Sequence, residues 1–235
     1  MILDGLLTSP LMAELKTPLL EQIASACHTK DFQEGDVLCH QNDVAHSVWL
    51  VLHGWVKLTR ETLDGGDAVW DVLGTGHLVG LETLTPPFTN TTRAVAVSDT
   101  TTLVIPHSVL RQLIDTHGEF ARLVLKHVLR QQQDERLEIE HRTHQTAPQR
   151  IGCFLLKLAG TPAKGKVDIQ LPFDKGLLAA RLGMQPETFS RALAKLKQET
   201  GLRMTGAHVE MDDVDALRAY TCGACSGTYP CHGHA

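Results

Sequence analysis

The sequence has no run of about 18 apolar residues, the length that an α-helix needs to cross a bilayer, so no membrane span is predicted. Its start, MILDGLLTSPLM, has neither the basic segment nor the small-residue cleavage site of a secretory signal, so we expect a cytoplasmic protein. Six cysteines occur in the 235 residues. Because cytosolic thiols stay reduced, we expect them to serve as ligands or sensors rather than as disulfides.

The sequence also lacks a basic excess. Its net charge of −5 argues against a broad nucleic-acid-binding coat, although a local basic surface remains compatible with it. No Ser/His/Asp order, glycine-rich phosphate loop or paired-carboxylate site emerges, so we do not expect an enzyme. The rival enzymatic interpretation is a thiol oxidoreductase using Cys222 and Cys225. Such a pair normally begins a helix in a βαβ fold, whereas this one lies in a terminal tail.

The first half of the chain predicts short strands. From residue 30 to about residue 106, apolar residues alternate with polar ones and glycines punctuate the pattern. Ser47–Arg60 reads as a strand, a tight turn at His53-Gly54 and a second strand, and Asp64-Gly65-Gly66 marks a hairpin. The sequence TTRAVAVSDTTTLVIP supplies two further strands. Closely spaced strands of this kind indicate a small barrel or jelly roll.

A short helix and then a long one, from Glu119 to about Thr143, follow the strands. Five residues recur at alternating intervals of three and four along the long helix and so form a stripe on one side of it: Leu125, Val128, Gln132, Glu135 and Ile139. This stripe suits a two-helix dimer interface whose polar members lower its stability. The alternative is an amphipathic helix that lies on its own barrel. We favour the dimer, because so polar a helix gains little by packing only on itself.

The second half predicts a helix-turn-helix over Asp174–Leu202. Asp174 can cap the first helix, Gly183 can end it in a left-handed conformation, and Pro186 suits the first turn of the next helix. Apolar residues mark the inner sides of the two helices, with Ala180 as the small residue where they would cross: Leu177, Leu178, Leu182, Phe189, Leu193 and Leu196. Two short strands around Thr205-Gly206-Ala207 predict a wing.

The outward side of the second helix carries side chains that can contact bases in the major groove of DNA. Arginine can bind guanine through two hydrogen bonds, glutamate can accept one from cytosine, and later basic residues meet phosphates. Six basic and three acidic residues between Asp174 and Arg203 leave a local excess of three positive charges. The predicted DNA-binding residues are Gln185, Glu187, Thr188, Ser190, Arg191 and Lys195. A solvated charged face of an ordinary helical subdomain is the alternative, and the wing argues against it.

Both halves together resemble the CRP/FNR family of bacterial transcription regulators. The resemblance rests on GDVLCHQND, VWLVLHGWVKLTR and GTGHLVGLE, and more specifically on LGMQPETFSRALAKL. Asn42 stands where the family usually has glycine, and asparagine tolerates the left-handed conformation better than most residues. The resemblance implies an α+β fold: an N-terminal cyclic-nucleotide-binding-like β-roll (jelly roll) plus a long dimerisation helix, then a winged helix-turn-helix domain. The predicted divisions are residues 1–117, 118–145, 146–219 and a cysteine-rich tail, 220–235.

The resemblance further implies a homodimer that binds double-stranded DNA. Glu187, Ser190 and Arg191 match the FNR-type E-x-x-S-R motif and would read a TTGAT-like half-site in an inverted repeat. A segment near Thr161–Gly165 would contact RNA polymerase. A small-molecule-binding protein with a vestigial helix-turn-helix is a second rival, against which the intact motif argues.

The resemblance does not identify the signal. Cyclic-AMP-binding members carry Gly-Glu and Arg-Ser pairs around the phosphate, but here Leu81 follows Gly80, and Asn90 and Thr91 fall at the second pair. Arg93 lies out of register, so cyclic AMP is not expected to bind. The N-terminal cysteine group of oxygen-sensing members is also missing. Cys39, beside His40, could be a sensor thiol or a haem ligand, and we interpret Cys27 and Cys153 as small buried hydrophobes.

The tail, YTCGACSGTYPCHGHA, reads as a metal-ligand cluster. Cys222, Cys225 and Cys231 could supply three thiolates, with a fourth ligand from His232, His234 or Cys153. This set suits an iron–sulfur cluster that senses oxygen, nitric oxide or redox state, or a structural zinc ion. A metal-free dithiol switch and a frayed tail are the remaining alternatives. We favour the iron–sulfur cluster by elimination, because no other credible sensor stands out.

Overall fold

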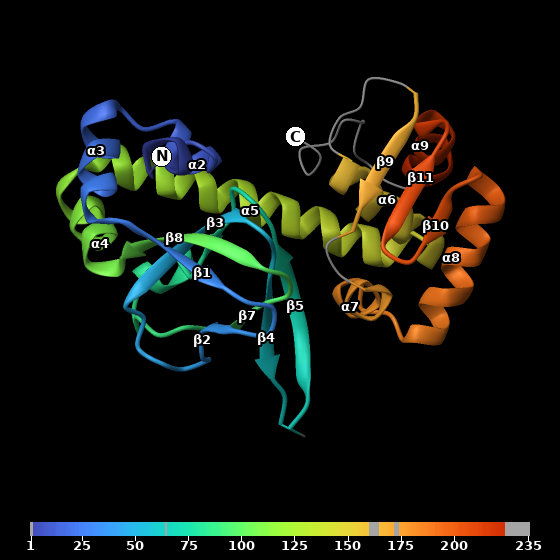
Figure 1. Ribbon diagram of the computed structural model, residues 1–235, viewed down its shortest axis with the longest axis horizontal. Helices are drawn as coiled ribbons and strands as arrows, with labels where there is room; N and C mark the ends of the chain where they lie inside the picture. Colours follow the sequence, from blue (N-terminus) through green and yellow to red (C-terminus); the bar gives the residue numbers. More distant parts are fainter. Residues whose placement is uncertain (1, 64, 160–164, 172–173, 224–235) are drawn as a thin grey trace. The chain divides into compact units, whose positions relative to one another are not determined.

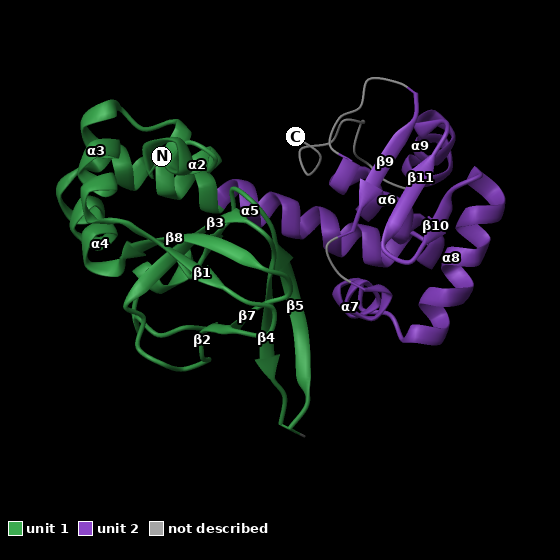
Figure 2. Cartoon of the chain, in the orientation of Figure 1, with its two compact units in different colours: residues 1–128 green, residues 129–235 purple. Residues whose placement is uncertain are grey.

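The computed structural model describes residues 2–63, 65–159, 165–171 and 174–223 (Figure 1). The chain divides into two compact units, residues 1–128 and 129–235 (Figure 2). Helix α5, Gly118–His144, crosses this division and contributes to both units. It matches the long helix predicted for residues 119–143. No helix among the described residues is long and apolar enough to cross a membrane.

Unit 1 is built on two four-stranded antiparallel sheets. Their strand orders are β1-β8-β3-β6 and β2-β7-β4-β5. This arrangement confirms the β-roll that the alternating pattern predicts. The strands are β1 His28–Phe32, β2 Val37–Cys39, β3 Ser47–His53, β4 Val56–Glu61, β5 Asp67–Leu73, β6 Leu78–Val79, β7 Arg93–Ala96 and β8 Thr100–Pro106.

The turn at Gly54 carries the chain from one sheet to the other. Strand β3 precedes it and β4 follows it, but they belong to different sheets and do not pair. Gly54 has a φ of +84°, and a Cβ there would lie 2.4 Å from the carbonyl oxygen of Asp99, so this close approach requires glycine. The predicted second hairpin is present: β4 pairs with β5, and the amide of Thr62 donates to the carbonyl of Gly66 at 2.8 Å.

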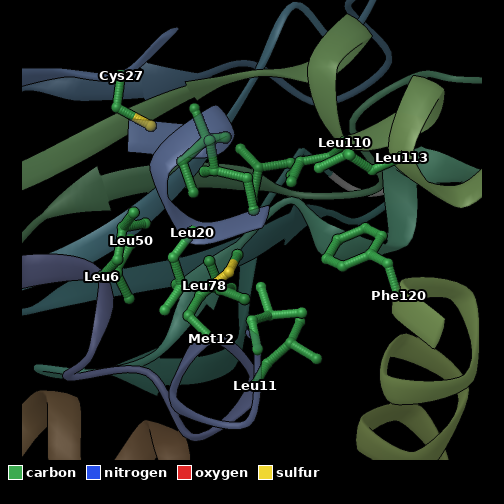
Figure 3. Packing of buried hydrophobic residues seen from close by; sticks show 14 of the residues in the cluster. Leu6, Leu11, Met12, Leu20, Cys27, Leu50, Leu78, Leu110, Leu113 and Phe120 are labelled. Atoms are coloured by element: carbon green, nitrogen blue, oxygen red, sulfur yellow. The ribbon is translucent and has the colours of Figure 1, made fainter. Parts of the chain in front are cut away.

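One hydrophobic cluster of unit 1 lies between the β-roll and a group of helices (Figure 3), and a second is formed by strand residues of the two sheets. Leu6, Leu50, Leu110 and Phe120 are fully buried within the first cluster. Burying one such side chain stabilises a fold by about 1.5–3 kcal/mol. The first three helices are not among the predicted elements, which begin at residue 30. The helices of this unit are α1 Ile2–Leu6, α2 Pro10–Ala13, α3 Thr17–Ala26, the 3₁₀ helix η1 Leu81–Leu84 and α4 His107–Thr116.

Among its described residues, unit 2 combines the second half of α5 with four further helices and a three-stranded sheet of order β10-β11-β9. Strand β9 pairs with β11. The elements are α6 Ala147–Ala159, β9 Val167–Gln170, α7 Lys175–Arg181, α8 Pro186–Thr200, β10 Arg203–Thr205, β11 His208–Met211 and α9 Val214–Cys222.

Candidate nucleic-acid interface

Helices α7 and α8 form the predicted helix-turn-helix. Asp174 caps α7 by accepting a 2.8 Å hydrogen bond from the amide of Leu177. Gly183 in the turn has a φ of +63°, the left-handed conformation that its position requires. Pro186 then begins α8, where its missing N–H leaves no helical hydrogen bond unmade. Local residue chemistry therefore positions the second helix.

The packing between α7 and α8 corrects one prediction. Leu178, Phe189 and Leu196 are buried, as expected for the inner sides of the two helices. Ala180 is exposed, however, and the small buried residue of α7 is Ala179, with 1% exposed surface. One residue along an α-helix is a rotation of about 100°, so a shift of one position moves a side chain from the inner side to solvent.

The outer side of α8 carries the predicted DNA-binding residues. Of these, five lie on the helix and Gln185 precedes it as the N-cap. All six are exposed: Gln185, Glu187, Thr188, Ser190, Arg191 and Lys195. Arg191 Nε donates to the carbonyl of Glu187 at 3.4 Å, which holds the guanidinium near the beginning of the helix. The polar groups needed for base recognition thus lie together on one solvent-facing side.

The predicted wing is the β10–β11 hairpin, with Gly206 at a φ of +60° in its turn. Arg203 donates two hydrogen bonds to Asp212, at 2.7 and 2.9 Å, and a longer one to Glu210. These carboxylates raise the pKa of the Arg203 guanidinium, with Asp212 making the larger contribution. Arg203 is therefore already paired and adds little to a phosphate-binding surface.

A second basic residue of the predicted excess, Arg181, is also paired. Its guanidinium donates to both carboxylate oxygens of Glu138, at 3.2 and 2.9 Å, and Lys157 lies 3.5 Å from the same carboxylate. Burial alone raises the pKa of Glu138, but Arg181 and Lys157 outweigh it and hold that pKa below its ordinary value. Arg191 and Lys195, by contrast, form no ion pair with any described residue. The available positive charge therefore centres on α8 and is smaller than the composition of Asp174–Arg203 implies.

Two carboxylates and one imidazole lie close together on the sheet β10-β11-β9. The donor atoms of Asp168, His208 and Glu210 lie within 4.8 Å of one another. Lys166 and Arg203 also contact Glu210, at 3.9 and 3.5 Å. The cluster is thus a network of exposed ion pairs, which the sequence pattern does not reveal because β9 and β11 are distant along the chain.

The predicted dimer stripe on α5 is exposed throughout. Its apolar members have exposed fractions of 57% at Leu125, 45% at Val128 and 64% at Ile139, and its polar members are Gln132 and Glu135. A different side of the helix packs on the core of unit 1 through Phe120, Leu123 and Val124. One side of the long helix therefore lies on its own β-roll, whereas the stripe is exposed and its role as a dimer interface stays a prediction.

The β-roll cysteines are poor candidates for thiolate chemistry. Burial raises the pKa of both Cys27 and Cys39 to about 11, so each thiol is protonated near neutral pH. The Cys39 thiol lies 3.8 Å from the carbonyl oxygen of Thr92. Cys153 is buried, as expected for a small hydrophobic residue. Its Sγ also lies 3.7 Å from His141 Nδ1, so it has a polar neighbour as well.

The tail begins within helix α9. Cys222 occupies the last turn of this helix and is half-buried. Thr221 is fully buried, and its hydroxyl would lie 2.3 Å from a Cβ added at Gly152 on α6, so α6 and α9 are in close contact. The remaining predicted metal ligands, Cys225, Cys231, His232 and His234, lie outside the described residues, as do residues 161–164 of the predicted polymerase segment.

The segment that corresponds to the nucleotide-binding loop is held together internally. Gly80 adopts a φ of +86° before η1, and Glu82 in η1 accepts a 2.9 Å hydrogen bond from the hydroxyl of Thr91. Asn90 is buried. Arg93 lies in β7, and its guanidinium is 3.6 Å from the carboxylate of Asp67. Asn42, which replaces the usual glycine, has the expected positive φ of 69°.

Comparisons with known proteins match both units. The cyclic nucleotide-binding domain model matches residues 29–117, and the Crp-like helix-turn-helix domain model matches residues 149–220. A solved structure from Ruegeria pomeroyi DSS-3, a protein for which cyclic nucleotide binding has been suggested, is 30% identical in sequence. The alignment covers 93% of this chain and 96% of that one, with a TM-score of 0.73.

Two curated relatives align with most of this chain, and one of them is a transcriptional activator by name. The cyclic AMP receptor protein of Thermus thermophilus is 27% identical over 215 residues, which are 92% of this chain and 98% of the relative. The transcriptional activator protein FnrA of Stutzerimonas stutzeri is 26% identical over 198 residues, which are 83% and 81% of the two chains. With a β-roll and a Crp-like helix-turn-helix aligned over most of its length, this chain belongs to the CRP/FNR family of DNA-binding transcription regulators.

Proposed function

We propose that the protein acts as a homodimer that binds an inverted repeat with TTGAT-like half-sites. The observation that carries this proposal is the common exposed side of α8, on which Glu187, Ser190 and Arg191 lie together. Buried residues on the opposite side hold that surface outward, among them Phe189 and Leu193. Two such helices must lie about 34 Å apart, one turn of DNA, to bind both half-sites together.

Each polar residue has a chemical role in this interface. The Arg191 guanidinium would donate two hydrogen bonds to guanine O6 and N7, and the Glu187 carboxylate would accept one from cytosine N4. Ser190 can donate or accept beside them. Lys195, one turn further along α8, would contact a phosphate. Gln185 and Thr188 at the beginning of the helix would complete the contacts to the groove.

The α5 stripe supports the homodimer. Leu125, Val128 and Ile139 expose apolar surface on one helix, and a second copy of α5 would remove it from water. Gln132 and Glu135 interrupt this surface and would lower the stability of the pair. A weak dimer is suited to regulation, because a modest signal can then shift how the two helices associate.

The proposed signal is oxygen, nitric oxide or redox state, sensed by an iron–sulfur cluster on Cys222, Cys225 and Cys231. Support comes from the raised pKa of Cys27 and Cys39, which disfavours thiolate ligands in the β-roll. A zinc-bound or dithiol tail, with haem or a small molecule in the β-roll, is the alternative. Cyclic AMP is disfavoured because Leu81, Asn90 and Thr91 stand where cyclic-AMP-binding members of the family carry the residues that hold the phosphate. RNA polymerase contact through residues 161–165 is proposed on the family resemblance alone.

Fluorescence anisotropy with a labelled duplex tests the DNA-binding proposal. The wild-type protein should prefer a TTGAT inverted repeat to a scrambled duplex, and Arg191→Ala should weaken this binding by about 10- to 100-fold, the worth of one good bidentate contact. Lys57→Ala removes one positive charge from strand β4 of unit 1 and serves as the control. Equal affinity of wild type and Arg191→Ala for the repeat would refute the assigned recognition surface.

A further inference from the structure

A small cavity, partly open to solvent, lies in unit 2, where the end of α5 meets α6 and α7. Its volume is about 40 Å³. A single water requires about 10–15 Å³ on the same measure, so the cavity can hold about three waters or one ion of a few non-hydrogen atoms. Among the residues that line it, we focus on Glu138, His141, Arg142, Gln145, Arg150 and Arg181.

Two residues that line this cavity are more than nine-tenths buried and lack hydrogen-bond partners. His141 and Gln145 each expose 6% of their surface. Neither His141 Nε2 nor either polar atom of the Gln145 side chain has a partner among the described residues. Arg150 Nε is in the same condition, although its Nη1 donates to the carbonyl of Leu182 at 3.4 Å. Buried polar groups are normally paired, so these three side chains indicate an occupant.

The cavity also has an excess of positive charge. Arg142, Arg150, Lys157 and Arg181 line it, against the single carboxylate of Glu138. That carboxylate is already engaged by Arg181 and Lys157. Arg142 and Arg150 form no ion pair with a described residue, and burial together with the Arg142 charge lowers the pKa of Arg150. Arg142 is exposed, whereas Arg150 is half-buried and has no counter-charge among the described residues, which favours an anion over water alone.

We propose that this cavity binds one small oxyanion, of the size of phosphate, through Arg150, His141 and Gln145. The Arg150 guanidinium supplies the charge-assisted hydrogen bond. The Gln145 amide, whose NH₂ group and carbonyl oxygen both lack partners among the described residues, can donate to an oxyanion and accept from one that keeps a proton, such as hydrogen phosphate. His141 Nε2 donates to the anion in the tautomer in which Nδ1 accepts from the Cys153 thiol.

The residues around this site come from α5, α6 and α7 and the segments that adjoin them. Gln145 lies in the link between α5 and α6, and Arg181 and Leu182 lie at the end of α7, directly before the turn that leads to α8. A bound anion would therefore hold the end of α5 to α6, beside the end of α7. The binding itself does not depend on the proposed DNA sequence or on the tail, so its test requires no DNA.

Isothermal titration calorimetry of the full chain with inorganic phosphate tests this site. We expect one phosphate per chain, with at least about tenfold weaker binding in Arg150→Gln, which removes the charge-assisted hydrogen bond. Arg122→Gln removes an exposed positive charge from α5 in unit 1 and should bind as the wild type does. No measurable phosphate binding, or equal affinity in wild type and Arg150→Gln, would overturn the proposal and leave ordered water as the occupant.

A second variant separates loss of binding from loss of folding. Gln145→Glu adds a carboxylate to the cavity that Arg150 lines. This carboxylate should take the place of the bound anion. We expect this variant to unfold at a higher temperature than the phosphate-free wild type and to bind no phosphate. The thermal midpoint of the wild type should rise with phosphate, whereas that of Gln145→Glu should not. A Gln145→Glu protein that still gains stability from phosphate would contradict the assigned site.

Discussion

Arg181, in the last turn of α7, donates two hydrogen bonds to Glu138 of α5, at 3.2 and 2.9 Å. The arginine side chain is 12% exposed and the glutamate side chain 31% exposed, so the pair is partly shielded from water. It fixes the first helix of the helix-turn-helix to the helix that carries the predicted dimer surface.

Removing the charge of Glu138 should therefore destabilise unit 2. We expect Glu138→Gln to lower the free energy of unfolding by about 1–3 kcal/mol, between the values for exposed and buried ion pairs. Asp212→Asn, in the exposed pair with Arg203, is the control in the same unit and should cost less than about 1 kcal/mol. Urea unfolding measures both, and equal effects would contradict the assigned importance of Glu138.

The same pair gives a pH dependence with a defined sign. The pKa of Glu138 in the folded protein lies below its ordinary value of 4.5. Its stabilising contribution is therefore fully present above pH 4.5 and is lost as the pH falls through the lower folded-state value. Unfolding measured from pH 6 down to about pH 3 should show a smaller loss of stability in Glu138→Gln than in the wild type. Parallel curves would exclude this carboxylate as the cause.

Neighbouring alanines on α7 provide a matched test of the packing. Ala179→Leu forces a larger side chain between α7 and α8 and should destabilise the protein by about 1–3 kcal/mol. Ala180→Leu adds the same atoms on the exposed side and should change stability by less than about 0.5 kcal/mol. Thermal unfolding of the two variants distinguishes them, and the reverse order would place the α7–α8 contact on the other side of the helix.

The dimer surface can be tested by improving it. Glu135→Leu replaces a charged residue in the α5 stripe with an apolar one, so the dimer should become more stable. Gln133→Leu makes a similar change on the opposite side of the same helix and should leave the monomer–dimer equilibrium unchanged. Sedimentation equilibrium measures both. An unchanged equilibrium in Glu135→Leu would mean that the stripe is not the interface.

Anaerobic purification with iron, zinc and acid-labile sulfide analysis tests the tail. Iron and sulfide should be present in the wild type and lost in Cys222→Ser, because one thiolate ligand is removed. The Cys222→Ser/Cys225→Ser double variant should fold but bind DNA without response to the signal. Cys27→Ser changes a buried β-roll thiol and should retain the metal. Zinc without iron would contradict the iron–sulfur proposal, and a haem spectrum would move the sensor to the β-roll.

Local signals explain what the sequence predicts well. The cap at Asp174, the left-handed Gly183 and the proline at residue 186 each act within a few residues, so the helix-turn-helix follows from short segments. The exposed side of α8 follows from helical periodicity in the same way. The choice of Ala180 over Ala179 fails because the sequence does not fix the helix phase to within one residue over a helix as short as α7.

Contacts between distant segments explain what the sequence does not predict. The pairing of Arg203 with Asp212 depends on the register of β10 and β11, so composition overestimates the free positive charge. The turn at Gly54 leads to a different sheet because strands from elsewhere in the chain pair with β3 and β4. His141 and Gln145 carry no motif, and their significance appears only when α5, α6 and α7 enclose them.

The contact between Gly152 and Thr221 fixes where Cys222 lies. Because α9 is held against α6, Cys222 stays close to the helix that carries Cys153. A metal centre that used Cys222 together with Cys153 would therefore draw both ligands from one chain, and its formation would not depend on the concentration of the protein.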